Sequence, residues 1–439
     1  MIITSVIFGL LCVVREIRII LRNKTINTIN IFGIMYAVTY GILTSYYLHT
    51  VNYDEHPYHR TLQQDSIDLL LWHVYAIISY LVIQIIYYNP RQTIIKRSFT
   101  SPSSKERTVL QWTAVICIVI GTISFYLWGK VYGSVMDMII EGSYVRSGIS
   151  DIYNPYSFMI RWVNLLFIAT FLVIKLIKLG VNKYFNFVIL IPLIFINIIY
   201  LLSTDGRLMM AMYPLLILLI SYNLLEPGKA NKKVLIRLAI WGVLAIVFIS
   251  KLNDITYYIK YGEMLDDVRV ESEGNFIVDE FGYIFMSAQQ ASSQCVTMGS
   301  PLLFFDDLIS GVFSWIPSSL KPDLALVNIW DYNTDLYYNG TFSGQMPCDF
   351  VTQSIYTCGM LGFIVMILIW ALLIKFADKL IRNNNSPFFE ALGYYVIYRF
   401  IYLVNYCSIF YFILGLFPIF VTIMIWYGVK CMYTLSLNS

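Results

Sequence analysis

Long apolar segments constrain this chain more than any other feature of its sequence. A membrane-spanning helix needs about 20 mostly apolar residues. Eleven segments approach or reach that length: 1–14, 29–48, 66–88, 109–128, 156–177, 185–202, 208–225, 234–250, 350–374, 388–405 and 408–428. Their apolar residues follow one another almost without interruption, whereas a membrane β-strand would alternate apolar and polar residues. The sequence therefore predicts an all-α fold, a polytopic membrane bundle of about eleven transmembrane helices.

The composition excludes several classes of protein. Hydrophobic residues make up 58% of the 439 residues and charged residues 13%, about half the charged fraction of a soluble domain. An ordinary soluble enzyme and a disordered chain are both excluded on this ground. The net charge of +3 is too small to indicate a nucleic-acid partner.

The basic residues predict the orientation of the chain. Lys and Arg favour the cytoplasmic side of a membrane, and most of the 30 in this chain fall in one set of alternate loops. The first such cluster, Arg15 to Lys24, follows its apolar segment, whereas a signal peptide carries its charges before the apolar run. We expect the N-terminus outside and the C-terminus in the cytoplasm.

The chain is predicted to have three parts. Residues 1–250 hold transmembrane helices 1 to 8, residues 251–349 form one large outer loop, and residues 350–439 hold helices 9 to 11. A loop of this length usually has structure of its own. From Phe276 to Cys295 an apolar stripe and a polar stripe follow helical spacing, which predicts an amphipathic helix. The polar stripe contains Glu280, Tyr283, Ser287, Gln290 and Gln294.

The rest of the outer loop predicts one further helix and an irregular segment. Pro301–Trp315 has helical spacing with Pro at its start. Its apolar residues are compatible both with a position in the membrane interface and with packing against the bundle. Residues 330–333, followed by Gly340, Gly344 and Pro347, are typical of irregular structure.

No cofactor or metal site is indicated. The sequence has no Walker loop, no dinucleotide-binding glycine motif and no HExxH motif. The spacing of His49, His56 and His59 in the first outer loop matches no strong metal signature, so we expect a solvated loop there. Cys295 and Cys348 both lie on the predicted outer side and are candidates for a disulfide in an oxidising compartment.

Charged residues in or beside a membrane are costly and often functional. Arg399 lies in the middle of an apolar segment, where Glu390 or a backbone group is a candidate structural partner. Further cations lie on the predicted outer side: Arg161, Arg207, Lys260, Arg269 and Lys321. One guanidinium group can bind two phosphate oxygens at once. Cations that face one outer cavity would therefore suit a lipid diphosphate. Arg161 and Arg207 are equally well placed to reach lipid headgroups.

Two carboxylates are candidates for a general base. Glu280 belongs to the polar stripe of the predicted loop helix, and Asp349 precedes the ninth apolar segment. A carboxylate that accepts the proton of a sugar hydroxyl assists attack of that hydroxyl on an anomeric carbon. Solvated acids without a catalytic role are the alternative for both.

Three short segments surround the outer loop in a suggestive order. They are STDGR at 203–207, IPSSLKP at 316–322, and a run from Gly340 through Pro347 and Asp349 to Gly362. With Arg399 late in the chain, this order resembles the bacterial O-antigen and oligosaccharide repeat-unit polymerases of Wzy type. The resemblance covers scattered pieces of residues 200–405, and the first half of the chain is similar only in hydropathy.

The resemblance implies a GT-C-like glycosyltransferase of the bacterial cytoplasmic (inner) membrane, active in O-antigen, capsule or exopolysaccharide synthesis. Such an enzyme transfers a growing glycan from undecaprenyl diphosphate to a second lipid-linked repeat unit on the outer face. It uses no nucleotide sugar, and membrane lipids and a chain-length regulator are its further partners. Arg207, Arg269 and Arg399, with Lys321, would hold the diphosphate, and Glu280 or Asp349 would activate the acceptor hydroxyl.

Other functions remain open. The resemblance to the related O-antigen ligases would require a His in the large outer loop, and the segment 251–347 contains none. A flippase for lipid-linked oligosaccharides would place its site at mid-membrane, often between repeated halves, and no repeat is evident here. An accessory subunit without catalysis is a third alternative.

Overall fold

The computed structural model describes residues 1–50, 67–88, 102–146, 152–204, 207–226, 228–251, 276–297, 302–316, 326–338, 345–382 and 386–438. Within these ranges the chain is all-helical and contains no strand. A single isolated bridge, antiparallel, joins Cys348 and Cys407 in the same ranges.

The predicted apolar segments of the first part fold as helices or short series of helices. They are α1 (Ile2–Asn23), α2 (Thr28–Ala37), η1 (Val38–Leu43), α3 (Thr44–Thr50), α4 (Ile67–Tyr87), α5 (Ser104–Gly129), η3 (Lys130–Tyr132), α6 (Val135–Arg146), η4 (Ser157–Met159), α7 (Ile160–Val163), α8 (Leu165–Lys178), α9 (Lys183–Thr204), α10 (Arg207–Ser221) and α11 (Lys232–Ser250). The last part is formed by α16 (Phe350–Arg382), α17 (Pro387–Tyr402) and α18 (Ile409–Asn438). Between them the outer loop contributes α13 (Phe276–Ala291), η6 (Ser292–Thr297), α14 (Asp306–Phe313) and α15 (Ile329–Tyr338).

Within the described ranges, six helical stretches are long and apolar enough to cross a membrane. They are Thr28–His49, Ile67–Tyr87, Ser104–Tyr132, Ser157–Lys178, Lys183–Thr204 and Ile409–Leu435. The all-α prediction is thereby confirmed for the described residues, and the six candidate spans agree with the prediction of a membrane protein. The total of eleven spans and the GT-C-like arrangement of the outer loop stay predictions.

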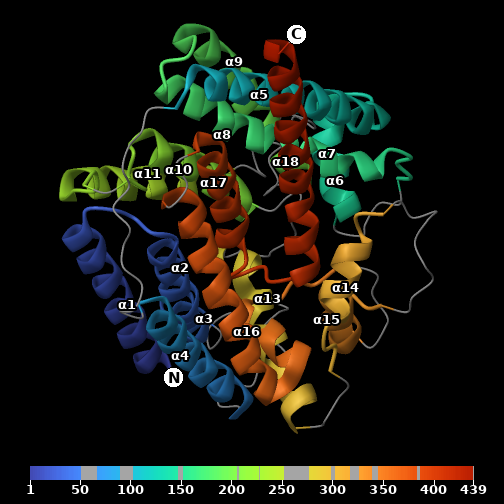
Figure 1. Cartoon of the computed structure of the whole chain (residues 1–439). Helices are drawn as coiled ribbons and strands as arrows, with labels where there is room; N and C mark the ends of the chain where they lie inside the picture. The colour runs from blue at the N-terminus through green and yellow to red at the C-terminus, as the bar shows by residue number, and fades with distance from the viewer. Residues whose placement is uncertain are drawn as a thin grey trace.

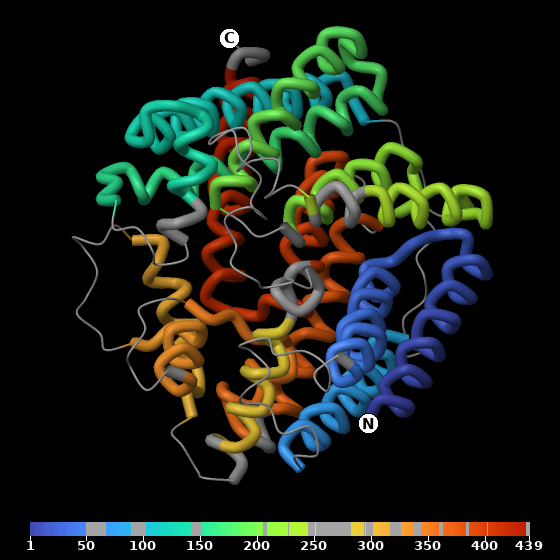
Figure 2. The backbone as a smooth tube through the Cα atoms, turned by 180° about the vertical axis from the view of Figure 1, so that it is seen from behind, coloured from blue at the N-terminus to red at the C-terminus, as the bar shows by residue number. Residues whose placement is uncertain are grey.

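Figure 1 shows how these helices are arranged. Helices α1 to α4 lie together at the lower left, α16 to α18 occupy the middle, and the loop helices α13 to α15 lie in the lower half. The two chain termini lie at opposite ends of the molecule in both views (Figures 1 and 2).

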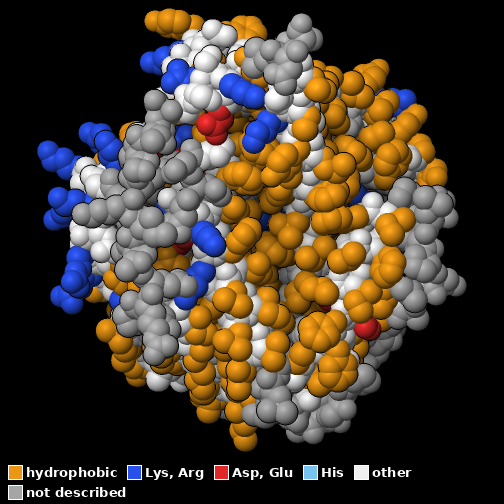
Figure 3. All heavy atoms as spheres, in the orientation of Figure 1, with side chains coloured by type: hydrophobic (Ala, Val, Ile, Leu, Met, Phe, Trp, Pro, Cys, Tyr) orange, Lys and Arg blue, Asp and Glu red, His pale blue; other side chains and the backbone are white. Residues whose placement is uncertain are grey.

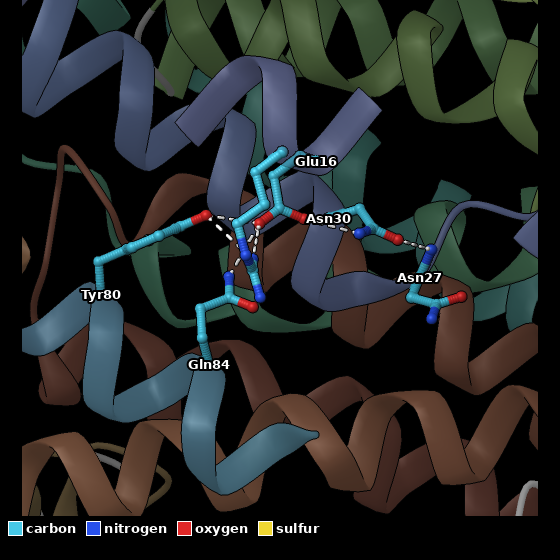
Figure 4. A network of polar contacts seen from close by, with 6 residues as sticks. Glu16, Asn27, Asn30, Tyr80 and Gln84 are labelled. Atoms are coloured by element: carbon cyan, nitrogen blue, oxygen red, sulfur yellow. Dashed lines mark hydrogen bonds and ion pairs between the residues drawn. The ribbon is translucent and has the colours of Figure 1, made fainter. Parts of the chain in front are cut away.

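A buried carboxylate joins α1, α2 and α4. Glu16 is fully buried and accepts hydrogen bonds of 2.6 to 3.0 Å from Arg15, Tyr80, Gln84 and Asn30 (Figure 4). A Cβ at Gly33 would lie 2.8 Å from Glu16 Cδ, so the small residue lets α2 approach α1 at this level. Because a charge in an apolar interior must be paired and hydrogen-bonded, this network fixes how the three helices align.

Two more carboxylates join helices whose ends were predicted to be cytoplasmic. Asp378 of α16 accepts from the backbone N–H of Thr28 at 3.0 Å, at the first turn of α2, and from the hydroxyl of Tyr87. Glu390 of α17 forms an ion pair with Lys175 of α8, with Nζ and Oε2 2.7 Å apart. The structure therefore gives Glu390 a partner on a neighbouring helix.

Contacts between loops divide the helix ends into two sets, those next to the basic loops and those next to the loop helices. Ala230 donates its backbone N–H to Lys24 at 2.9 Å, and Lys105 donates to Thr434 at 2.9 Å. These residues come from the basic loops that the sequence assigns to one side. The loop helices contact the opposite ends, as in the stacking of Phe285 on Tyr47 with ring centroids 4.0 Å apart. Ends predicted to share a side thus meet, while the orientation of the chain in the membrane stays a prediction.

Both stripes of helix α13 make contacts within the protein, in the residues whose side chains the structure describes. Ile284, Phe285 and Ala288 of the apolar stripe are buried, and Phe285 also meets the ring of Trp72 on α4 at 5.8 Å. The polar stripe contacts the backbone of three other segments: Tyr283 donates to Asn405 O, Ser287 to Pro347 O and Gln290 to Leu336 O. The predicted amphipathic helix is therefore confirmed for its described residues, and it lies between the bundle and the outer segments.

Two predictions for the outer loop are corrected: the second loop helix is present but shorter than Pro301–Trp315, and a segment predicted as irregular is helical. The helix expected from Pro301 begins only at Asp306, because Phe304 has φ of 44° and Leu303 donates its N–H to Tyr356 O at 3.0 Å. Residues 330–333, predicted as irregular, belong to α15. There the Asn328 side chain accepts the Trp330 N–H at 2.9 Å, an N-terminal hydrogen bond that starts the helix.

Helix α14 turns its polar stripe inward and its apolar stripe outward. Asp307, Gly311 and Ser314 are buried against α18, and a Cβ at Gly311 would lie 3.0 Å from Ile413 Cβ. The exposed stripe consists of Phe304, Phe305, Leu308, Ile309 and Val312. Figure 3 shows that hydrophobic side chains also cover the neighbouring surface of α18, while Lys and Arg gather towards the left and upper-left edge. The alternative of packing against the bundle is therefore confirmed, and the position of the exposed apolar face in the membrane interface stays a prediction.

We predict that replacement of Glu16 by Ala destabilises the chain by about 2–4 kcal/mol, because three buried donors lose their acceptor. Thermal unfolding in detergent measures this. Arg18→Ala on the exposed side of the same helix is the matched control and should unfold like the unmodified chain. Equal unfolding temperatures for the two variants would contradict the structural role of the network.

We predict that the exposed stripe of α14 contacts lipid. A nitroxide attached to Val312→Cys, in a chain with Cys431→Ser, should collide more often with oxygen than with a water-soluble nickel chelate, because oxygen concentrates in lipid. Asp335→Cys on the exposed side of α15 is the control site and should show the reverse. Preferential collision of the label at 312 with the nickel chelate would show that α14 faces water.

Candidate functional site

Two irregular segments meet at the ends of α16, α17 and α18 that are predicted to lie on the outer side. Cys407 donates its N–H to Cys348 O at 2.7 Å, and Phe350 donates to Val404 O at 3.1 Å. Trp330 of α15 adds a bond from its indole N–H to Cys407 O at 2.9 Å. The segments 346–349 and 403–408 thus satisfy each other's backbone, which a position away from bulk water requires.

Asp349 caps α16. It is fully buried, and its carboxylate accepts from Tyr40 at 2.5 Å, Trp72 at 3.2 Å and the Val351 N–H at 3.0 Å, and also from the Thr352 hydroxyl and N–H. Burial raises the pKa of this carboxyl, while the hydrogen bonds oppose the rise. An acid that precedes a helix and bonds its first free N–H groups is a helix cap. The geometry therefore gives Asp349 a structural task that ties α16 to α2–η1 and α4.

Asp307 ties the loop helices to the bundle. Its carboxylate accepts the N–H of Ile329 at 3.1 Å and of Phe410 at 2.9 Å, with Ser408 at 3.3 Å and Gln353 at 3.4 Å. Burial raises its pKa as well, again opposed by the hydrogen bonds. One side chain thereby connects α14 to the first turns of α15 and α18 and to α16.

Asn333 of α15 forms a third polar centre. Its amide nitrogen donates to Ser287 at 2.8 Å and to Met346 O at 2.9 Å, and its oxygen accepts from Tyr356 at 2.7 Å. Thr334 beside it accepts the Met346 N–H at 2.7 Å. These bonds hold α13, α15 and α16 around the segment that leads to Asp349.

Arg399 lies where α17 and α18 cross. Its Nη2 donates to the carbonyl of Tyr411 at 3.2 Å, and the side chain is partly buried. A Cβ at Gly415 would lie 2.9 Å from Arg399 Cζ, so the guanidinium packs directly on the backbone of α18. Tyr411 belongs to the same turn of α18 as Phe410, and its ring lies 4.3 Å from that of Trp330. Arg399 is thus next to the turn that Asp307 holds.

For the other predicted site residues, the structure describes at most the position of the backbone. Glu280 lies on α13, one turn before Tyr283, and Arg207 is the first residue of α10. Their side chains, and Arg269 and Lys321 altogether, lie outside the described residues. The structure therefore brings Asp349 and Arg399 to the same end of α16–α18 and leaves the predicted set of cations as a prediction.

Two residues of this region were missed by sequence reasoning. Asp307 lies on the polar stripe of α14 together with Gly311 and Ser314, and small residues on one helix face are a signal for close packing in membrane proteins. Asn333 carries no signal in the sequence, since one amide in a polar loop is ordinary. Within the described residues no group of three or more His, Cys, Asp and Glu side chains is placed to hold a metal ion.

Aromatic and polar groups share the surface beside Arg399. The hydroxyl of Tyr411 bonds the side-chain oxygen of Gln345, and Gln345 donates to Asp331 at 2.9 Å. Gln345 is exposed and Tyr411 partly so. Aromatic rings with adjacent amide and carboxylate groups fit the apolar face and the hydroxyl groups of a sugar, and the guanidinium fits an anion such as phosphate.

Comparison with known proteins gives no match: no family model, no curated protein and no solved structure is similar to this chain.

We predict that Asp349→Asn folds nearly as well as the unmodified chain, because Asn caps helices about as well as Asp. Asp349→Ala should lose about 2–4 kcal/mol, since buried donors then lack an acceptor. Thermal unfolding of both variants in detergent checks this. Equal stability of the Ala variant and the unmodified chain would refute the capping role, and loss of activity in a stably folded Asn variant would restore Asp349 as a candidate base.

Proposed function

We propose that the chain is a membrane glycosyltransferase that polymerises undecaprenyl-diphosphate-linked oligosaccharide repeat units on the outer face of a bacterial cytoplasmic membrane. The observation that carries the proposal is the position of Arg399: a guanidinium within an apolar helix, beside the aromatic surface of the outer loop. The order of motifs around that loop supports the same class of reaction.

The electrostatics of Arg399 favour an anionic ligand. A cation among apolar helices is costly unless a task retains it. A guanidinium carries five N–H donors, and Arg399 Nη2 donates to the carbonyl of Tyr411. The sequence offered Glu390 or a backbone group as its structural partner, and Glu390 pairs with Lys175. A diphosphate carries the negative charge and the paired oxygens that a guanidinium binds best.

In the proposed reaction a hydroxyl of the acceptor sugar attacks the anomeric carbon of the donor glycan. The bond between that carbon and the diphosphate oxygen breaks, and the bonding electrons leave with the diphosphate. Arg399 would stabilise the charge that develops on the leaving group, with Arg207, Arg269 and Lys321 as further candidates. No metal ion or nucleotide is required by this scheme.

Glu280 is the base that we propose. It is one turn before Tyr283, whose hydroxyl donates to Asn405 O in the segment next to Cys407. Asp349 accepts five hydrogen bonds as a cap, and its oxygens are occupied in that role. We therefore assign Asp349 to positioning and Glu280 to proton transfer from the acceptor hydroxyl.

We predict that Arg399→Ala lowers the amount of long-chain glycan about 10²–10³-fold, the usual effect of removing one group that stabilises developing charge. The gene is deleted and restored with each variant, and glycans are separated on a gel beside an immunoblot of the protein. Arg237→Ala on the exposed face of α11 is the matched control and should restore the full ladder. A full ladder from Arg399→Ala would refute the proposed diphosphate site.

The deletion itself separates the competing functions. Single repeat units without a ladder indicate a polymerase. Long polymer that stays on its lipid carrier indicates a ligase, and lipid-linked units trapped inside the cell indicate a flippase. Gly415→Ala adds a geometric test, because the new methyl group would displace the Arg399 guanidinium and should shorten the ladder without loss of protein.

A further inference from the structure

Cys348 and Cys407 face each other across the irregular segments of the outer side. They are the two partners of the isolated antiparallel bridge, and the Cys407 N–H donates to Cys348 O at 2.7 Å. Residues opposite each other in an antiparallel pair have Cα atoms about 4.5–5.5 Å apart and side chains on one face. A disulfide needs a Cα separation of about 4.4–6.8 Å, so the bridge provides the backbone geometry of a cross-linked pair.

The Cys348 side chain is turned towards Cys407. Both cysteines are fully buried as free thiols, and the Cys348 thiol donates to Cys407 O at 3.5 Å. The sequence alone offered Cys295 as a candidate partner of Cys348, but Cys295 belongs to η6 and has no such backbone pairing with it among the described contacts. The remaining cysteines, Cys12, Cys117, Cys358 and Cys431, lie within helices.

We propose that Cys348 and Cys407 form a disulfide bond as the chain folds on the oxidising outer side of the membrane. The inference uses the orientation assumed in the proposed function and no part of the glycosyl-transfer scheme. The bond would join the residue before the α16 cap to the loop between α17 and α18. It would therefore hold together the two segments on which Asp349, Asp307 and Trp330 all converge.

The oxidant is a disulfide carried by a thiol–disulfide oxidoreductase. The thiolate of one cysteine attacks that disulfide and forms a mixed disulfide, and the donor's first sulfur leaves as a thiol. The second cysteine then attacks the mixed disulfide, so the Cys348–Cys407 bond forms and the donor is released as a dithiol. The two cysteines lose two electrons and two protons, and the donor gains both.

Burial of the two thiols determines when during folding the disulfide can form. Burial raises the pKa of both thiols well above the ordinary value, which disfavours the reactive thiolate once the segments have packed. Exchange therefore takes place before the two segments close over each other. In the folded chain the bond is shielded from reductants for the same reason.

The experiment counts free thiols in the full-length chain, purified from membranes without reductant and then denatured with an alkylating reagent. We expect two fewer alkylated cysteines than in a reduced sample, in which all seven react. Peptide mass mapping should find the Cys348 peptide linked to the Cys407 peptide. Cys348→Ser and Cys407→Ser should each abolish the difference between reduced and unreduced samples, whereas Cys295→Ser should leave it unchanged.

Two outcomes would overturn the proposal: alkylation of all seven cysteines without reduction, or a linked peptide that pairs Cys348 with Cys295. The count is made on denatured protein, so a variant that folds poorly still gives an answer. The glycan ladder is a separate measurement. A reduced pair in a chain that makes the ladder rejects the disulfide alone, and a linked pair in a chain without polymerase activity rejects the proposed function alone.

Discussion

Buried carboxylates hold the helices of this chain in register. Lipid and apolar side chains are alike in polarity, so helices in a membrane gain little from hydrophobic association, and polar contacts and close packing decide how they align. Within the described ranges five acids are buried, and each contacts another element: Glu16, Asp307, Asp349, Asp378 and Glu390. Glu16, Asp378 and Glu390 lie near the helix ends that are joined by basic loops. Asp307 and Asp349 lie near the helix ends that contact the loop helices. Because an acid that loses its donors in an apolar interior is strongly unfavourable, each of these contacts excludes alternative alignments.

The apolar segments themselves were predictable from the sequence, because length and hydropathy suffice to define a helix in lipid. The pairing of helices was not. Glu16 and Asp378 look like ordinary acids near basic loops, and only the fold brings Tyr80 or Thr28 to them. The same limit applies to Arg399, for which the sequence offered Glu390 or a backbone group: the structure shows a bond to the carbonyl of Tyr411, and Glu390 pairs with Lys175.

The outer loop shows where sequence patterns mislead. A polar stripe on a helix normally faces water, yet α13 turns Ser287 and Gln290 towards backbone carbonyls, and α14 buries Asp307 while Phe305 stays exposed. Both helices sit where irregular segments supply many backbone groups that need partners. The rule that polar faces meet polar partners still holds. The partners here are protein, and the sequence alone does not distinguish them from water.

A cation and an apolar surface lie close together at the start of α18. The first turns of α18 contact Arg399 through Tyr411 and Gly415 and contact α14 through Gly311. The exposed stripe of α14 continues through Trp315, whose ring lies 5.9 Å from Phe420 on the outer surface of α18. In the proposed reaction the leaving group carries a long lipid tail that must stay in the bilayer while its diphosphate meets a cation. The Arg399 guanidinium and the exposed apolar surface of α14 and α18, if that surface contacts lipid as predicted, satisfy both demands within a few turns of one helix. The crossing of α17 and α18 is therefore where the proposed function places the carrier.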